Sequence, residues 1–259
     1  MTTFSVIGAG NLGSNLIFAL RGSQYSFKYI YNRSRYPLFS SHIEASLEKV
    51  ISGSDVIFIS VQESGISEAV NEIGSMKNLS GKIFFHTSNS LTSDELIPLR
   101  DKGGIVASFS PLQTFPEFTK DLNIFSGVYF LSEGDPEAVK LADQISEYLK
   151  ARNLEVEKGS KIFLHIGAVI SSNFFNSLLR FADLQVKKGG DFNYEILLPL
   201  VKQTLKNIEK EGLYKSLTGP ASRKESGIIS KHMDSLSGSE KELYRLLNKS
   251  ISKDRKDLS

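Results

Sequence analysis

The stretch T-F-S-V-I-G-A-G-N-L-G, residues 3–13, decides how the first part of this chain is interpreted. A short apolar run leads directly into the pattern GxGxxG, and leucine and isoleucine then recur at helical spacing. In this setting the first glycine permits a tight turn, the second lets the backbone approach a pyrophosphate, and the third lets the helix pack on the strand. The helix N-terminus then faces the phosphates. We therefore expect dinucleotide contacts from Gly8, Gly10, Asn11, Leu12 and Gly13.

Strand-length apolar runs alternate with helical segments up to about residue 156. The expected strands are residues 3–7, 28–31, 56–61, 82–86, 105–108, 128–131 and 154–157. The expected helices between them are residues 12–21, 65–73, 93–99 and 136–151. Alternation of this kind is typical of a mostly parallel sheet with helices on both faces. The sequence therefore predicts an α/β fold with an N-terminal Rossmann domain.

The pattern becomes helical from residue 158 onward. Residues 160–188 contain no proline and carry apolar residues at helical spacing, and a pair of glycines ends the segment. Further helices are expected at residues 194–212, 222–236 and 239–251. We therefore expect a Rossmann NADP-binding domain over residues 1–157, followed by an all-helical substrate and dimerisation domain over residues 158–259. Two long apolar helices bury little area against one small domain, so we expect a homodimer.

Composition excludes several classes of protein. The chain has 259 residues, a formal net charge of +2 and no cysteine. This charge favours neither nucleic acid nor a membrane surface as a partner. Without cysteine there is no disulfide, thiolate zinc site or cysteine nucleophile, and no HExxH pattern or other ligand cluster predicts a metal. No run approaches about 20 uninterrupted apolar residues. Because the first strand begins at once, no signal peptide fits, and we expect a cytoplasmic protein. The partner we expect is a small-molecule substrate.

The end of the second expected strand indicates which dinucleotide binds. NAD-specific sites usually place an Asp or Glu about 20 residues after the glycines. Here the strand ends in Asn32, Arg33 and Ser34, with no carboxylate. An arginine and a hydroxyl suit the 2′-phosphate of NADP. The alternative is that these residues form a solvated basic turn with no ligand. We favour NADP over NAD as the cofactor.

Several polar residues are candidates for contact with nicotinamide or substrate. Val61, Thr87 and Ser88 stand at strand ends, where the nicotinamide of a Rossmann cofactor lies. The long helix carries a set of polar residues, His165, Ser172, Asn173 and Asn176. Counted at 100° per residue, His165, Ser172 and Asn176 share a stripe. We expect His165 to give or take the proton that accompanies hydride transfer, and Asn173 to bind substrate. The alternative is a polar set buried between helices or in a dimer contact.

Longer motifs make the chain similar to a known family. They are GAGNLG at 8–13, NRS at 32–34, HTSNS at 86–90, SPLQTFP at 110–116, LHIGAVISSN at 164–173, LPL at 198–200 and LTGPASR at 217–223. With these motifs the chain resembles the Rossmann-like proteins with a DUF2520 C-terminal domain. This family is described as NADP oxidoreductases, related to pyrroline-5-carboxylate and ketopantoate reductases. The last four motifs are the most specific, because a generic Rossmann fold requires none of them.

The resemblance also implies roles for individual residues. The related reductases carry a catalytic lysine and then asparagines on the first long helix after the Rossmann domain. By analogy, His165 stands near the lysine position and Asn173 near a substrate-binding asparagine. Thr218 and Arg223 become candidates for substrate or interdomain contact.

The chain departs from the family pattern at three points. Ser110 stands where the family usually has histidine. Gln62-Glu63 replace the usual Pro-Asp, and Lys224-Glu225 replace Gly-Asp. These departures put the family roles of the histidine and of the aspartate after Pro in doubt for this chain.

The sequence as a whole predicts an NADP-dependent oxidoreductase that moves hydride between nicotinamide and a C=O or C=N carbon. Two alternatives stay open. One is an imine reductase resembling pyrroline-5-carboxylate reductase. The other is a non-catalytic NADP(H)-binding sensor, which the serine at position 110 keeps open.

Overall fold

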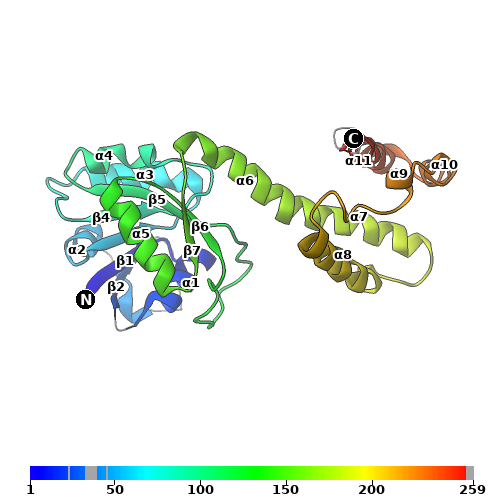
Figure 1. Cartoon of the computed structure of the whole chain (residues 1–259). Helices are drawn as coiled ribbons and strands as arrows, with labels where there is room; N and C mark the ends of the chain where they lie inside the picture. Colours follow the sequence, from blue (N-terminus) through cyan, green and yellow to red (C-terminus); the bar gives the residue numbers. More distant parts are fainter. Residues whose placement is uncertain (23, 33–39, 45, 255–259) are drawn as a thin grey trace. The chain divides into compact units, whose positions relative to one another are not determined.

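The computed structural model of the chain describes residues 1–22, 24–32, 40–44 and 46–254. The chain divides into two compact units, residues 1–172 and 173–259. Figure 1 gives the element labels. The expected domain boundary after residue 157 rests on the change in sequence pattern and stays a prediction.

The first unit is built on one twisted sheet. Its strand order is β2-β1-β3-β4-β5-β6-β7, and each of the expected strands appears among the described residues. The strands are β1 Thr2–Ile7, β2 Tyr25–Tyr31, β3 Val56–Ile59, β4 Ile83–His86, β5 Ile105–Pro111, β6 Tyr129–Gly134 and β7 Arg152–Glu155. Neighbouring strands run parallel except β5 and β6, which are antiparallel. The expected α/β fold with a mostly parallel sheet is confirmed.

Helices cover both faces of this sheet (Figure 1). Helices α1 (Asn11–Leu20) and α5 (Pro136–Tyr148) contribute buried residues to the core on one face. Helices α2 (Leu47–Ser52), α3 (Glu63–Gly74) and α4 (Ile97–Arg100) pack on the other. Short 3₁₀ turns lie at Ser40–His42, Ser93–Leu96 and Lys158–Ser160.

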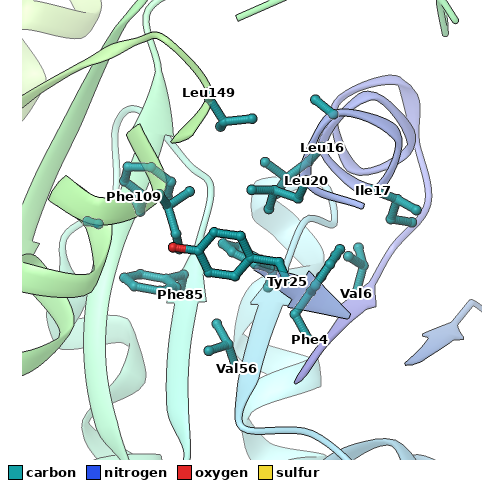
Figure 2. Packing of buried hydrophobic residues seen from close by; sticks show 14 of the residues in the cluster. Phe4, Val6, Leu16, Ile17, Leu20, Tyr25, Val56, Phe85, Phe109 and Leu149 are labelled. Carbon is teal, nitrogen blue, oxygen red and sulfur yellow. The ribbon is translucent and has the colours of Figure 1, made fainter. Parts of the chain in front are cut away.

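Aromatic side chains fill the core beneath α1 and α5. Figure 2 shows Tyr25 among Phe4, Leu16 and Leu20 from the start of the chain and Phe85, Phe109 and Leu149 from farther along it. The rings of Phe109 and Phe130 stack with centroids 4.4 Å apart. Because successive side chains of a strand point to opposite faces, Ser108 and Ser110 point to the face opposite Phe109. This alternation places two serines of β5 among the polar groups of the candidate site.

The helical part of the chain follows in order. Its elements are α6 Lys161–Val169, a π-helical segment Ile170–Phe174, α7 Phe175–Lys188, a 3₁₀ turn Tyr194–Leu197, α8 Leu198–Glu211, α9 Pro220–Arg223, α10 Ser226–Asp234 and α11 Gly238–Asp254. The expected helix over residues 160–188 is therefore interrupted by a π-helical segment. A wider turn changes the angle per residue, so the stripe counted at 100° per residue does not hold across it.

The segment Lys158–Lys188 is also long and apolar enough to cross a membrane, judged by length and composition alone, with a mean hydropathy of 1.5 over its most apolar window. None of that window is buried within the chain. This differs from the sequence expectation, which counted uninterrupted apolar residues. Uncharged polar residues such as Ser171 and Ser172 break the run but lower the mean hydropathy only a little.

The turn between β1 and α1 depends on two close backbone approaches. Gly8 has a φ of +92°, which L side chains rarely adopt. A Cβ on Gly13 would lie 2.3 Å from the carbonyl oxygen of Gly8. At Gly10 a Cβ would meet nothing within 4 Å. Gly8 and Gly13 are therefore required by the fold itself, whereas Gly10 is not.

We expect Gly13→Ala to lower the free energy of unfolding by about 1–3 kcal/mol, because the new methyl group forces the helix away from the strand. Gly10→Ala is the matched control, with an expected change within about 0.5 kcal/mol. Thermal and urea unfolding followed by circular dichroism measure both. Equal stabilities for the two variants would contradict this account of the turn.

Candidate active site

A cleft opens at the carboxyl ends of β1, β2 and β3. Its volume is about 560 Å³. The lining includes Gly8 and Gly10 from the glycine turn, Tyr31 and Asn32 after β2, and Val61 after β3. In parallel α/β sheets, ligands bind outside the carboxyl ends of the strands. The predicted contacts Gly8, Gly10, Asn32 and Val61 are thus brought together around one cavity.

The glycine turn fits a pyrophosphate on a direct geometric ground. Gly10 is the N-cap of α1 and lines the cleft, and the space where its Cβ would stand is open. Helix α1 therefore begins with unobstructed backbone at the cleft. Free N–H groups and the helix dipole at such an end favour a negatively charged group. The residues present fit the phosphates of a dinucleotide.

Two other residues of the predicted motif, Asn11 and Leu12, contact other parts of the chain. The side chain of Asn11 donates to the carbonyl oxygens of Phe115 and Pro116, at 3.0 and 2.8 Å. One turn later, Asn15 donates to Glu117 O and accepts from the backbone N–H of Thr119. These bonds pin the loop after β5 onto α1. The side chain of Leu12 packs against the core.

The expected 2′-phosphate contacts Arg33 and Ser34 lie outside the described residues. At the same end of the cleft, Tyr31 donates its hydroxyl to Glu72 at 3.0 Å. Asn32 lines the cavity and makes a further interaction.

A buried lysine organises the carboxyl ends of β4 and β5. Lys161, the first residue of α6, is fully buried. Its Nζ donates to Ser88 O at 3.0 Å and to the hydroxyl of Ser108. Burial lowers the pKa of Lys161 to about 8, while the carboxylates of Glu133 and Glu63 act in the opposite direction. An amine with a pKa near the working pH is typical of a functional site.

His86 lies beside this lysine as a neutral imidazole. Its Nε2 is 2.9 Å from the carbonyl oxygen of Thr92, which only accepts, and its Nδ1 accepts from Ser88 N–H at 3.2 Å. Burial, and then the charge of Lys161, lowers the pKa of His86 to about 4. Both ring nitrogens are used within the chain, so His86 fixes the turn after β4.

Glu63, at the start of α3, faces the same turn. Its Oε1 accepts from the hydroxyls of Ser88 and Ser90. Burial raises the pKa of Glu63, but the two hydroxyls and the nearby His165 outweigh burial and hold the pKa below its usual value. Glu63 is therefore an ionised carboxylate close to His165.

The other predicted residues divide between the two units. In the first unit, Thr87 donates to the hydroxyl of Ser60 at 3.3 Å, and Ser88 is held as above. His165 lies one turn after Lys161, and its Nδ1 is buried without a hydrogen-bond partner in the described chain. Asn173 belongs to the second unit, within the π-helical segment. Its role with His165 stays a prediction.

Lys161 and Glu63 are the site residues that the sequence analysis did not identify. Lys161 precedes His165 by four residues, which places both on one face of α6. That spacing was the available signal. Glu63 was noted as a departure from the family pattern, and a carboxylate in a first helical turn is usually explained by the helix dipole alone.

Residues 128–251 match the family model "Domain of unknown function (DUF2520)". No curated protein matches the chain.

Solved structures of similar fold cover nearly the whole chain. One is "putative NADP oxidoreductase BF3122" from Bacteroides fragilis, with a TM-score of 0.76 and 24% identity over 97% of this chain and 98% of that chain. Another is protein TM1727 from Thermotoga maritima, with a TM-score of 0.72 and 22% identity over 98% and 99%. A third is a reductive aminase from Aspergillus terreus in complex with NADPH and ethyl levulinate, with a TM-score of 0.70 and 16% identity over 98% and 94%.

At these identities the solved structures show the fold, which is a Rossmann-like sheet followed by helices. The family model covers the last strands of the sheet and nearly all of the helical part. Residues 128–251 are thus similar to the DUF2520 family model, and the chain as a whole has a Rossmann-like fold.

Proposed function

We propose that the protein is an NADP(H)-dependent oxidoreductase that transfers hydride between nicotinamide and a small C=O or C=N substrate. In this proposal residues 1–157 bind the cofactor, and residues 158–259 meet the substrate and form a dimer. The chain works in the cytoplasm, with which its lack of cysteine is compatible. NADP is favoured over NAD by Arg33 and Ser34 in the sequence, and the similar aminase was solved with NADPH.

One observation carries the proposal. Gly10 lines an open cleft at the N-terminus of α1, and no fold contact explains why the residue lacks a side chain. A bound pyrophosphate explains it, because the phosphate oxygens need the backbone at close range. Titratable groups with shifted pKa values, Lys161 and Glu63, stand beyond this cleft at the ends of the next strands.

The side chains at the strand ends supply the rest of the chemistry. When bound, the nicotinamide gives or takes the hydride. His165 gives the proton to the substrate oxygen or nitrogen, or orients that atom, and its unpartnered Nδ1 is available for this. Lys161 anchors α6 to Ser88 and Ser108 and so positions His165 one turn later. Asn173 binds the substrate.

Gly10→Val should abolish cofactor binding without unfolding the protein. The side chain fills the open space above the helix N-terminus and meets no other part of the chain within reach of its Cβ. Titration with NADPH and NADH, followed by nicotinamide fluorescence, should show micromolar binding to the unaltered protein with NADPH preferred. We expect the affinity of the variant to fall at least about 100-fold, since the phosphates lose their backbone contacts.

Arg33→Ala in the same titration tests the choice of dinucleotide. It should weaken NADPH binding and leave NADH binding unchanged. Lys140→Asp, an exposed change on α5, serves as a control for nonspecific effects. The oxidoreductase proposal fails if neither nucleotide binds to the unaltered protein.

His165→Ala should leave NADPH affinity unchanged and lower turnover by about 100-fold or more, which is typical of losing a general acid. The measurement is NADPH oxidation at 340 nm with carbonyl and imine compounds. Asn173→Ala should mainly raise KM. If the protein binds NADPH but oxidises it with none of these compounds, the result favours the alternative function, a non-catalytic NADP(H)-binding sensor.

We also propose a homodimer whose contact includes α6. Its side chains Ile162, Phe163 and Ile166 are exposed in the chain alone, and Phe163 is 73% exposed. Contiguous exposed apolar side chains of this size mark a surface that a partner covers. A second copy fits because neither the net charge nor any charged face of the helix favours another class of partner.

Light scattering at micromolar concentration should give twice the chain mass of 28.7 kDa. Phe163→Asp should give the mass of one chain, because a carboxylate in an apolar contact is strongly unfavourable. Lys140→Asp should stay dimeric. A single-chain mass for the unaltered protein would exclude the dimer.

A further inference from the structure

The cleft at the carboxyl ends of β1, β2 and β3 is lined by two kinds of surface. The turn at Gly8 and Gly10 offers backbone, which fits the pyrophosphate of the proposed cofactor. Helix α3 lines the same cleft with the carboxylates of Glu68 and Glu72. Among the described residues of the lining there is no lysine or arginine. A phosphate is therefore favoured at the glycine turn and is unfavourable beside the carboxylates.

These two surfaces lie at different points along the cleft. Val61 is next to the glycine turn, since a Cβ on Gly8 would lie 2.7 Å from Val61 Cγ1. It is also next to Gly65 in the first turns of α3, where a Cβ would lie 3.5 Å from Val61 Cγ2. Glu72 follows Gly65 by seven residues, which is about 10 Å along the helix axis. The cleft therefore extends from the glycine turn, past Val61, to Glu72.

Tyr31, the last residue of β2, connects the two surfaces. Its carbonyl oxygen accepts from the backbone N–H of Gly8 at 2.9 Å, and its hydroxyl donates to Glu72 Oε1 at 3.0 Å. The side chain is half-buried, packs against the core beneath α3 and lines the cleft. Because its backbone and its hydroxyl are both held, the aromatic ring is fixed in the wall of the cleft.

The neighbouring part of α3 leaves room for a flat group. Gly65 and Ala69 both line the cleft, and a spacing of four residues places them on one face of the helix. A methyl group on Gly65 would make only an ordinary contact with Val61, so packing does not explain this glycine. A nucleobase fits such a surface, because every base has a π face that can stack on an aromatic ring such as that of Tyr31.

The carboxylate of Glu72 selects among bases. A carboxylate only accepts hydrogen bonds and has about four acceptor sites, so the bond from Tyr31 leaves capacity for a ligand. The 6-amino group of adenine donates, whereas the 6-oxo group of hypoxanthine or guanine accepts and is repelled. Glu68 makes a further interaction of its own, and we therefore assign this contact to Glu72.

We propose that Tyr31 and Glu72 form the base subsite of the cleft, in which the base stacks on the Tyr31 ring and its 6-amino group donates to Glu72. The protein then prefers an adenine dinucleotide to a 6-oxopurine dinucleotide. The inference rests on the proposed function and names the residues that recognise the base of its cofactor. Arg33, the expected contact of the 2′-phosphate, follows Tyr31 by two residues, which is consistent with the attachment of that phosphate and the base to one ribose.

The first experiment measures binding and does not depend on turnover. The full-length protein is titrated with NADPH and with its reduced hypoxanthine analogue, and nicotinamide fluorescence is followed. The two dinucleotides differ only at the 6 position and the adjacent N1 of the base. We expect NADPH to bind at least about tenfold more tightly, because the analogue loses a charge-assisted hydrogen bond and turns an acceptor toward Glu72. Equal affinities overturn the inference while the proposed oxidoreductase stands. Absence of binding by both dinucleotides is the separate result that removes the proposed function, and the inference with it.

A change at Glu72 tests the assignment of the carboxylate. Glu72→Gln should lower the preference for NADPH to below about threefold, because the amide can donate to the 6-oxo group and carries no charge that repels it. Glu147→Gln is the matched control, since Glu147 is also exposed and lies near the end of a helix, that of α5. This control should keep the full preference. An unchanged preference in Glu72→Gln overturns the assignment.

Changes at Tyr31 separate stacking from the hydroxyl bond. Tyr31→Phe keeps the ring and should lower the preference for NADPH, because Glu72 loses the bond that orients it. Tyr31→Leu removes the ring and should weaken both dinucleotides about fivefold or more, as expected for the loss of base stacking. Circular dichroism shows whether each variant is folded. Unchanged affinities in Tyr31→Leu, or an unchanged preference in Tyr31→Phe, overturn the role given to Tyr31.

Discussion

The burial of the Lys161 ammonium is the interaction on which the candidate site depends. A buried charge is tolerated only where hydrogen bonds and opposite charges compensate for lost water. Ser88 O, Ser108 Oγ and the field of Glu133 meet this need at the ends of β4 and β5. The start of α6 is thereby fixed to the sheet, and His165, one turn later, comes to lie near Glu63. The burial of the Lys161 ammonium, which is unfavourable by itself, thus fixes the point at which α6 leaves the sheet.

The proposed cofactor site and the residues proposed to meet the substrate are built by different means. The glycine turn offers backbone: the fold requires glycine at positions 8 and 13, and Gly10 leaves the N-terminus of α1 open toward the cleft. At the other end, the function resides in side chains that loops must position. Asn11 and Asn15 of α1 hold the loop after β5, which begins beside Ser110. Helix α1, whose N-terminus opens to the cleft, therefore also holds the loop after β5 in place.

Sequence patterns predicted the sheet but not the contacts that assemble the site. Each expected strand is present because strands buried on both faces, such as β3, are continuous apolar runs that are easily identified. The antiparallel pairing of β5 with β6 could not be predicted, since an irregular connection leaves direction open. Lys161 is separated from Ser88 and Ser108 by 73 and 53 residues, and its burial exists only once the fold brings them together. The π-helical segment at residues 170–174 likewise has no clear local sequence signal.

The residues around the ends of β4 and β5 bear on the presence of serine at position 110. The family usually has histidine there, a residue able to deliver a proton, and serine cannot replace it in that role. Among the described histidines and lysines at this edge, His86 uses both ring nitrogens and Lys161 is enclosed by its partners. Under the proposed function, His165 therefore remains as the group that exchanges a proton with the substrate.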